Sequence, residues 1–256
     1  DLHYDESEQA ICEAIGLARS AFKDVRPPSR AAAAEAPPHV ERVVVLVSPS
    51  YYEQRKQFYA NRENCTVHPL LFSWPLSADQ LKILLRIGDD TTKSQPLYVS
   101  VMLNYLRGLQ RSDEMPSFKK FLEDTSTMFD NPNQSSALEQ RLSLLTSFVR
   151  EADENAHFVD RQDDFRELFN KPGVLVVADL TDPMMSRKDA TSVFHILLTQ
   201  FRQLRLPFGK VVAFDEAHKY LDGTKSGLAD AIVTTVRLMR HEGIRVLIST
   251  QSPVCL

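Results

Sequence analysis

Two adjacent carboxylates directly follow a short apolar run in the last quarter of the chain. Residues 211–214 read Val-Val-Ala-Phe and predict a buried strand, and Asp215 and Glu216 come next. In open α/β sheets, ligands bind outside the carboxyl ends of the strands, and a buried charge is costly unless it is paired or metal-bound. The pair therefore predicts a magnesium–nucleotide site, in which Asp215 positions the ion and Glu216 activates a water. The alternative is a strand that runs into an acidic loop.

A second polar strand end follows further along the chain. Arg240 lies near the end of a predicted helix, and Gly243 fits the position after a helix end, where φ is often positive. A short apolar strand then ends in Thr250 and Gln251. If the two strands are parallel, these residues reach the same sheet edge as the carboxylates. A glutamine there can donate to a phosphate oxygen or orient a water.

This arrangement resembles the HerA/FtsK group of P-loop ATPases, which includes ring-forming DNA pumps and conjugative coupling proteins. The resemblance rests on residues 174–256: a strand ending in Asp-Glu, a helix, the pattern R-x-x-G-I, and a strand ending in T-Q-x-P. It implies that Asp215 and Glu216 form the Walker B pair. It further implies that Gln251 senses the γ-phosphate and that Arg240 is a trans-acting arginine finger. ATP, Mg²⁺, a homo-oligomeric ring and DNA are the implied ligands and partners.

The chain departs from this family in one respect. No G-x-x-x-x-G-K-[ST] phosphate loop occurs in it, although that loop cradles the phosphates. Residues 223–227, Gly-Thr-Lys-Ser-Gly, have suitable residue types in the wrong order and follow the Asp-Glu strand, so we interpret them as a flexible loop. We expect a fragment whose phosphate loop lies upstream, because the sequence starts inside a predicted helix without Met and stops after the Thr-Gln strand. A degenerate, non-hydrolysing scaffold is the alternative.

A DEAH-type helicase is a further alternative, because residues 215–218 spell Asp-Glu-Ala-His. Such helicases follow the box with a strand ending in S-A-T, whereas this chain has S-T-Q-S-P after R-x-x-G. The sequence therefore favours the translocase interpretation and treats His218 as an incidental loop residue.

Composition limits the class of protein and the surroundings in which it works. A formal net charge of −4 over 256 residues gives no general nucleic-acid signal, so any contact with DNA must be local. The three cysteines are far apart and unpatterned, which argues against disulfides or a zinc site and suits a reducing compartment. No apolar run reaches the ~18 residues of a membrane span. We expect an intracellular protein, cytoplasmic or nuclear, without a membrane segment.

The predicted elements divide the chain into three parts. Residues 1–76 form the N-terminal part of an α/β core, starting with a helix over 5–24. Residues 77–169 carry four amphipathic helices, the first of them capped by Ser77, and no convincing strand, which predicts an all-helical insertion. Residues 170–256 complete the core in the order β-α-β-α-β, which implies parallel strands. We therefore predict a RecA-like parallel sheet of the P-loop NTPase type with a helical insertion.

Three predicted strands precede the Asp-Glu strand. Residues 42–47 predict a strand that is continuously apolar after Arg42, as in a parallel strand buried on both faces. Residues 66–72 contain Pro69 and predict a short or edge strand. Residues 174–177 end near Asp179, which either contacts the site or joins a helix N-cap network; we favour the N-cap.

Overall fold

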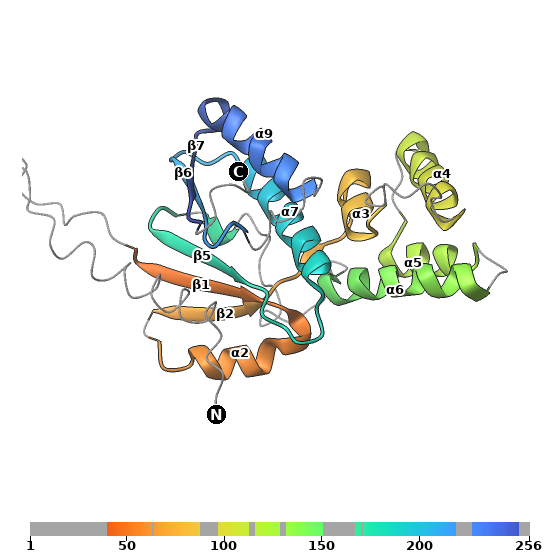
Figure 1. Cartoon of the computed structure of the whole chain (residues 1–256), viewed down its shortest axis with the longest axis horizontal. Coiled ribbons are helices and arrows are strands. Elements are labelled where there is room, and N and C mark those ends of the chain that lie inside the picture. Colours follow the sequence, from red (N-terminus) through yellow and green to blue (C-terminus); the bar gives the residue numbers. More distant parts are fainter. Residues whose placement is uncertain are drawn as a thin grey trace, which may run out of the picture.

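The computed structural model describes most of the chain. The described residues are 40–62, 64–87, 97–112, 116–128, 132–150, 167–169, 171–218 and 227–250. The predicted helix over 5–24, most of the 223–227 segment and Gln251 lie outside these ranges. The protein is α/β with small parallel sheets, in agreement with the predicted class (Figure 1).

A three-stranded parallel sheet has the order β2-β1-β5. Its strands are β1 (Arg42–Val47), β2 (Cys65–Pro69) and β5 (Val174–Asp179), and α2 (Tyr52–Tyr59) connects β1 to β2 after a 3-10 turn, η1 (Pro49–Tyr51). The prediction of a short or edge strand around Pro69 is confirmed, because β2 is an edge strand and ends there. The chain then forms a separate two-residue strand, β3 (Phe72–Ser73).

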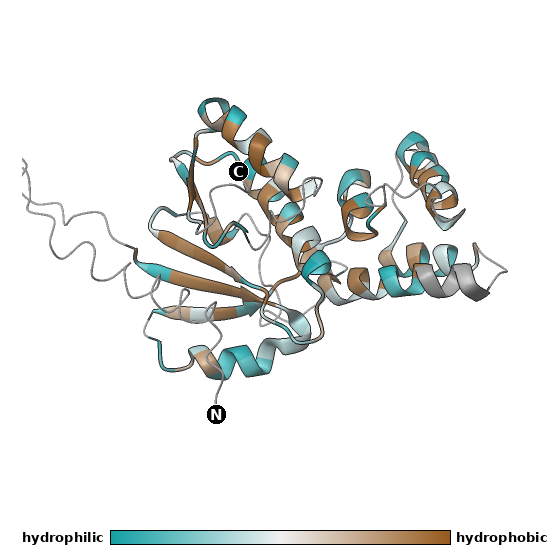
Figure 2. Cartoon of the chain, viewed as in Figure 1, coloured by the Kyte–Doolittle hydropathy of each residue, from teal (hydrophilic) through white to brown (hydrophobic). Residues whose placement is uncertain are grey.

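Both faces of β1 are buried, as its continuous apolar run predicts. Val43, Val45 and Val47 pack with Tyr59 of α2 on one face. Val44 and Leu46 point into the main core on the other face, together with side chains of α7 (Arg187–Gln203) and of the helical part. Figure 2 shows β1 and β5 as largely hydrophobic strands, whereas α2 is largely hydrophilic.

Four helices lie between β3 and η2 (Glu167–Phe169) and extend to one side of the sheets (Figure 1). They are α3 (Ala78–Leu84), α4 (Leu97–Ser112), α5 (Phe118–Ser126) and α6 (Pro132–Phe148). Ser77 begins α3 with a capping box shared with Gln80, as its sequence predicts. One detail differs from the expectation: β4 (Val149–Arg150) follows α6 and pairs with β3 in parallel.

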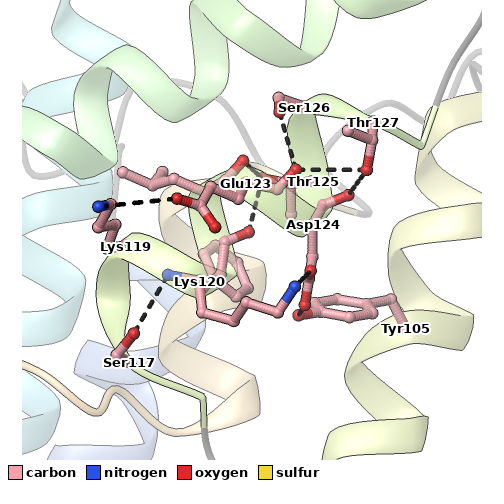
Figure 3. Close-up of polar contacts among 11 residues, drawn as sticks. Tyr105, Ser117, Lys119, Lys120, Glu123, Asp124, Thr125, Ser126 and Thr127 are labelled. Carbon is pink, nitrogen blue, oxygen red and sulfur yellow. Dashed lines mark hydrogen bonds and ion pairs between the residues drawn. The ribbon is translucent and has the colours of Figure 1, made fainter.

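A small polar network joins α4 to α5 (Figure 3). The Tyr105 hydroxyl donates to Asp124 at 3.1 Å, and Lys120 Nζ lies 2.6 Å from the same carboxylate. Burial and the hydrogen bond to Asp124 raise the pKa of Tyr105 to about 12. The hydrogen bond from Lys120 lowers the pKa of Asp124, although partial desolvation opposes it. The network helps to fix the angle between the two helices.

The Asp-Glu strand and the Thr-Gln strand form a second parallel sheet. It consists of β6 (Lys210–Phe214) and β7 (Ile244–Ile248), connected by α9 (Gly227–Glu242). The parallel pairing is confirmed, but β5 pairs with β1, and among the described residues no strand pairing joins β5 to β6. Figure 1 shows α7 and α9 side by side next to this sheet.

The expectation that these two strands are buried is wrong for one face. Val212, Phe214 and Ile248 pack against α7 and α9. On the other face, Val211 is 57% exposed and Leu247 is 60% exposed. The reason is that both helices cover the same face, and no other described element packs on the opposite one.

A buried ion pair links α2 to the carboxyl end of β5. Arg55 is 3% exposed and pairs with Asp179, to which its Nε donates at 2.7 Å. The Tyr59 hydroxyl donates to the same carboxylate at 3.0 Å, and burial raises the pKa of this tyrosine above its usual value. The predicted N-cap role of Asp179 is therefore wrong, because Ser186 caps α7 and the Asp179 carboxylate is taken up by α2.

A second polar contact joins the carboxyl ends of β1 and β5. The hydroxyls of Ser48 and Ser50 both donate to Asp182 Oδ2, at 2.6 and 2.5 Å. Burial opposes ionisation of Asp182, but these bonds and the backbone N–H of Met184 outweigh it and hold the pKa of the carboxyl below its usual value. The Arg55–Asp179 pair and the serine bonds to Asp182 thus satisfy the carboxylates at these strand ends with partners from the protein itself.

Removing one partner of the buried ion pair should strongly destabilise the fold. Arg55→Ala leaves Asp179 buried without its cation, and we expect a loss of about 3–5 kcal/mol in the free energy of unfolding, measured by urea denaturation. Lys56→Ala, at an exposed position of the same helix, should change it by less than about 0.5 kcal/mol. Equal effects of the two substitutions would contradict a stabilising role for the pair.

Candidate functional site

The ends of β6 and β7 are held together by two backbone hydrogen bonds. Ser249 N–H donates to the carbonyl of Phe214 at 2.8 Å, and Ala217 N–H donates to the carbonyl of Ser249 at 2.9 Å. These bonds continue the parallel ladder beyond the register that pairs Phe214 with Ile248. The residues after each strand therefore lie at one edge of the sheet, as the sequence predicts. Asp215 is exposed there and Glu216 is half-buried.

Glu216 occupies a left-handed backbone conformation, with φ of 49°. Such a φ costs a residue with a side chain roughly 1–2 kcal/mol, so surrounding contacts must hold it. Its N–H donates to Asp215 Oδ1 at 3.0 Å, and the next residue, Ala217, is only 1% exposed. The turn is thus held by the hydrogen bond to Asp215 on one side and by the buried Ala217 on the other. Outliers of this kind cluster at functional sites, and the strain singles out Glu216 among the residues of this edge.

His218 lies against the carboxylate of Glu216. Its Nε2 is 3.4 Å from Glu216 Oε2, and the His218 side chain is 25% exposed. Sequence reasoning treated His218 as an incidental loop residue and missed this contact. The tight turn at Glu216 brings the two side chains together. The only signal of this contact in the sequence is that a glutamate and a histidine, which can pair, are two positions apart.

Neither a family model nor a curated protein sequence matches this chain.

The second strand contributes Thr250 to the same edge. Thr250 directly follows Ser249, whose N–H and carbonyl both bond to the β6 end, and its side chain is half-buried. The predicted sensor, Gln251, lies outside the described residues, so its position at this edge stays a prediction. The described edge therefore contains the two carboxylates, His218 and Thr250.

The structure does not bring Arg240 to this edge. Arg240 is exposed in the last turn of α9, and the chain turns at Gly243, with φ of 63°, before β7 begins. Gly243 thus adopts the positive φ that its sequence position predicts. Because β6 and β7 are parallel, Arg240 is at the amino end of the sheet and Glu216 is past its carboxyl end. Five strand residues at roughly 3.3 Å each separate the two ends by about 17 Å, more than an arginine side chain spans.

An ion pair and a buried lysine fasten the amino end of the sheet. Arg202 donates to both carboxylate oxygens of Glu242 through Nε and Nη2, at 2.9 and 2.7 Å. These hydrogen bonds lower the pKa of Glu242, against a smaller opposing effect of desolvation. Lys210 is 6% exposed, and its Nζ donates to the carbonyls of Phe201, Arg202 and Leu204, which end α7. The last turn of α9, which carries Arg240, is therefore held rigidly on α7.

The donor set at the carboxyl edge suits a weakly held, nucleotide-dependent magnesium ion. Within the described ranges, no group of at least three His, Cys, Asp and Glu side chains is placed to hold a metal. Mg²⁺ in nucleotide sites is typically bound by one or two carboxylates, the substrate phosphates and water. Asp215 fits this role because it is exposed and uses Oδ1 only for the N–H of Glu216.

The structure gives no sign of a membrane segment within the ranges it describes, because none of their helices is long and apolar enough to cross a bilayer.

Glycine at position 216 should stabilise the turn relative to alanine. Both substitutions remove the carboxylate and its contact with His218, but only glycine adopts φ of 49° without a Cβ clash. We expect Glu216→Gly to exceed Glu216→Ala by about 1 kcal/mol in the free energy of unfolding, measured by urea denaturation. Equal stability of the two variants would show that residue 216 is not strained in the folded protein.

Proposed function

We propose that this chain is part of the motor core of an ATP-hydrolysing protein that resembles HerA/FtsK-like DNA translocases, with a RecA-like sheet. The observation that carries the proposal is the edge at which Asp215 and the strained Glu216 meet the end of β7. Adjacent acids at the end of a parallel strand, beside a second polar strand end, match the geometry that phosphoryl transfer to water needs. The required phosphate loop is not among the 256 residues and has to come from outside them.

Glu216 is the general base in this proposal. A water oxygen bonds to the γ-phosphorus, the bond from that phosphorus to the β–γ bridging oxygen breaks, and ADP and phosphate result. The proton of the water passes to the Glu216 carboxylate. Positioning and charge stabilisation dominate such reactions, so a base held by a fastened backbone turn is well suited to the step.

Asp215 would hold the magnesium ion at the same edge. Bound Mg²⁺ neutralises the negative charge that develops on the phosphate oxygens. The Asp215 Oδ1 bond to the Glu216 N–H fixes the direction of the Asp215 carboxylate. A single acidic turn therefore orients the metal ligand and places the backbone of the base.

Arg240 would act on a neighbouring subunit of a ring. Its place at the amino end of β7, about 17 Å from the carboxyl edge by strand rise, makes a role in its own site geometrically unsuitable. Its exposure on a helix end anchored through Arg202 and Glu242 suits a rigid contact with another copy. Arg237 lies one turn earlier on the same helix and is also exposed. DNA is proposed as the substrate of the ring on the basis of the family resemblance alone.

The non-hydrolysing scaffold is less well supported than the motor. A scaffold has no need of a glutamate in a left-handed conformation, because glycine or asparagine adopts it at lower cost. The combination of φ of 49° at Glu216 with the exposed carboxylate of Asp215 at the same strand end supports a role for this edge in binding or catalysis. The DEAH-type helicase shares Asp215, Glu216 and His218, and no observation at this edge favours it over the translocase.

Replacing the base should abolish turnover without abolishing nucleotide binding. Glu216→Gln in the complete gene product keeps the size of the side chain but cannot accept the proton, so ATP hydrolysis should fall to background while ATP affinity stays near that of the wild type. Steady-state phosphate release and nucleotide titration measure the two properties. Glu53→Gln, at an exposed position of α2, is the matched control and should hydrolyse normally.

Two results would contradict this assignment. Unchanged hydrolysis by Glu216→Gln would remove Glu216 from the mechanism. Robust, Glu216-dependent hydrolysis by the 256-residue chain alone would show that no external phosphate loop is needed.

Mixing two inactive variants should test whether Arg240 acts between subunits. An arginine supplied in trans can contribute ~10³–10⁵ in rate in GTPases, so Arg240→Ala and Glu216→Gln should each be inactive. In mixed rings, some interfaces join an intact Glu216 to an intact Arg240, and hydrolysis should partly recover. If the mixture stays inactive while the rings assemble and exchange subunits, Arg240 has no trans role and serves the helix end, where a cation is worth ~0.3–1 kcal/mol.

A further inference from the structure

His218 contacts the proposed base through one nitrogen of its ring. Nε2 lies 3.4 Å from Glu216 Oε2, and the side chain is three-quarters buried. The other ring nitrogen, Nδ1, is buried and has no hydrogen-bond partner within the described part of the chain. Nε2 is therefore the nitrogen through which the ring meets a carboxylate, and packing around the ring limits how far it can turn.

The strained turn places the Glu216 backbone but does not by itself direct its carboxylate. A glutamate has three rotatable side-chain bonds, so its oxygens sample several positions unless a neighbour restrains them. The adjacent Asp215 carboxylate repels that of Glu216 because both are negative. His218 Nε2, which lies beside Oε2, is placed to oppose this repulsion.

We propose that His218 is a positioning residue for Glu216, a role that rests on the proposed ATP hydrolysis. Its Nε2–H donates to Glu216 Oε2 and holds the carboxylate in the orientation in which Oε1 accepts the proton of the attacking water. His218 itself takes no part in the bonds that form or break. This role separates His218 from nucleotide binding, so it should influence kcat and leave KM for ATP nearly unchanged.

Two amide substitutions distinguish the two ring nitrogens. The amide nitrogen of glutamine lies close to where Nε2 lies, whereas that of asparagine lies closer to Nδ1, one bond too short to reach Glu216. His218→Ala and His218→Asn should therefore lower kcat about 10- to 100-fold, as loss of an orienting partner commonly does. His218→Gln should keep most of the wild-type kcat. His241→Ala, an exposed histidine in α9, is the matched control and should turn over like the wild type.

The experiment is steady-state hydrolysis by the complete gene product, with thermal unfolding of every variant. Loss of kcat in Ala and Asn, rescue by Gln, and constant KM and Tm would support the positioning role. Equal losses in all three variants, a loss that follows Tm, or an unaffected His218→Ala would overturn it while Glu216→Gln remains inactive. If wild-type protein hydrolyses no ATP, or Glu216→Gln is unaffected, the proposed function fails and the role of His218 fails with it.

Discussion

Parallel pairing of β6 with β7 is the constraint from which the candidate site follows. Parallel neighbours need a crossover, and here α9 supplies it and packs on the sheet with Leu228, Ala231 and Ile232. Both strands then end at the same edge, where Ser249 bonds to Phe214 and Ala217. Without this pairing, the carboxylates and the polar end of β7 would be unrelated loops. The chemistry proposed for the edge therefore depends on backbone hydrogen bonds more than on side-chain packing.

The amino and carboxyl ends of the β6–β7 sheet differ in what their polar side chains contact. At the amino end, Arg202 binds Glu242 through two hydrogen bonds and Lys210 donates to carbonyls at the end of α7, so these three polar side chains stabilise the fold. At the carboxyl end, Glu216 is held in an unfavourable conformation and the neighbouring Asp215 is exposed. A strained residue persists only where rigid surroundings hold it, and the fastened amino end contributes to that rigidity.

The polar strand ends of the other sheet contrast with those of the candidate site. At the carboxyl ends of β1 and β5, Asp179 is paired with Arg55, and Asp182 accepts hydrogen bonds from two serines. In α/β proteins, ligands bind at strand ends of this kind. These two carboxylates, however, already accept hydrogen bonds from side chains of the protein itself. Position at a sheet edge is thus insufficient to identify a site. The distinguishing features of the β6 end are exposure of Asp215 and strain at Glu216.

The helical part shares its core with the first sheet. Leu81 and Leu84 of α3 belong to the same buried cluster as Val44 of β1 and Ile196 of α7. Arg86, just after α3, lies 3.7 Å from Asp189 of α7. Because α7 also packs on α9, the helices and the β6–β7 sheet meet on one element.

Local pattern by itself determined most of the longer described elements and several of their ends. Continuous apolar residues predicted β1 because a parallel strand buried on both faces needs them, Ser77 predicted a helix start, and Gly243 predicted a positive φ. The same reasoning predicted that Asp215 and Glu216 end a strand parallel to the one that leads to Thr250. These features depend on residues close in sequence, so the sequence contains the necessary information.

Only the tertiary structure decided which strand pairs with which and which polar groups meet. Arg55 and Asp179 are far apart in the chain, and their pairing, which replaced the predicted N-cap role, depends on α2 packing across the sheet. Val211 and Leu247 are exposed because α7 and α9 both pack on the opposite face of the β6–β7 sheet. The contact of His218 with Glu216 results from a backbone strain that residue types do not reveal. Long-range packing decides such contacts because their free energy comes from groups that the local sequence does not contain.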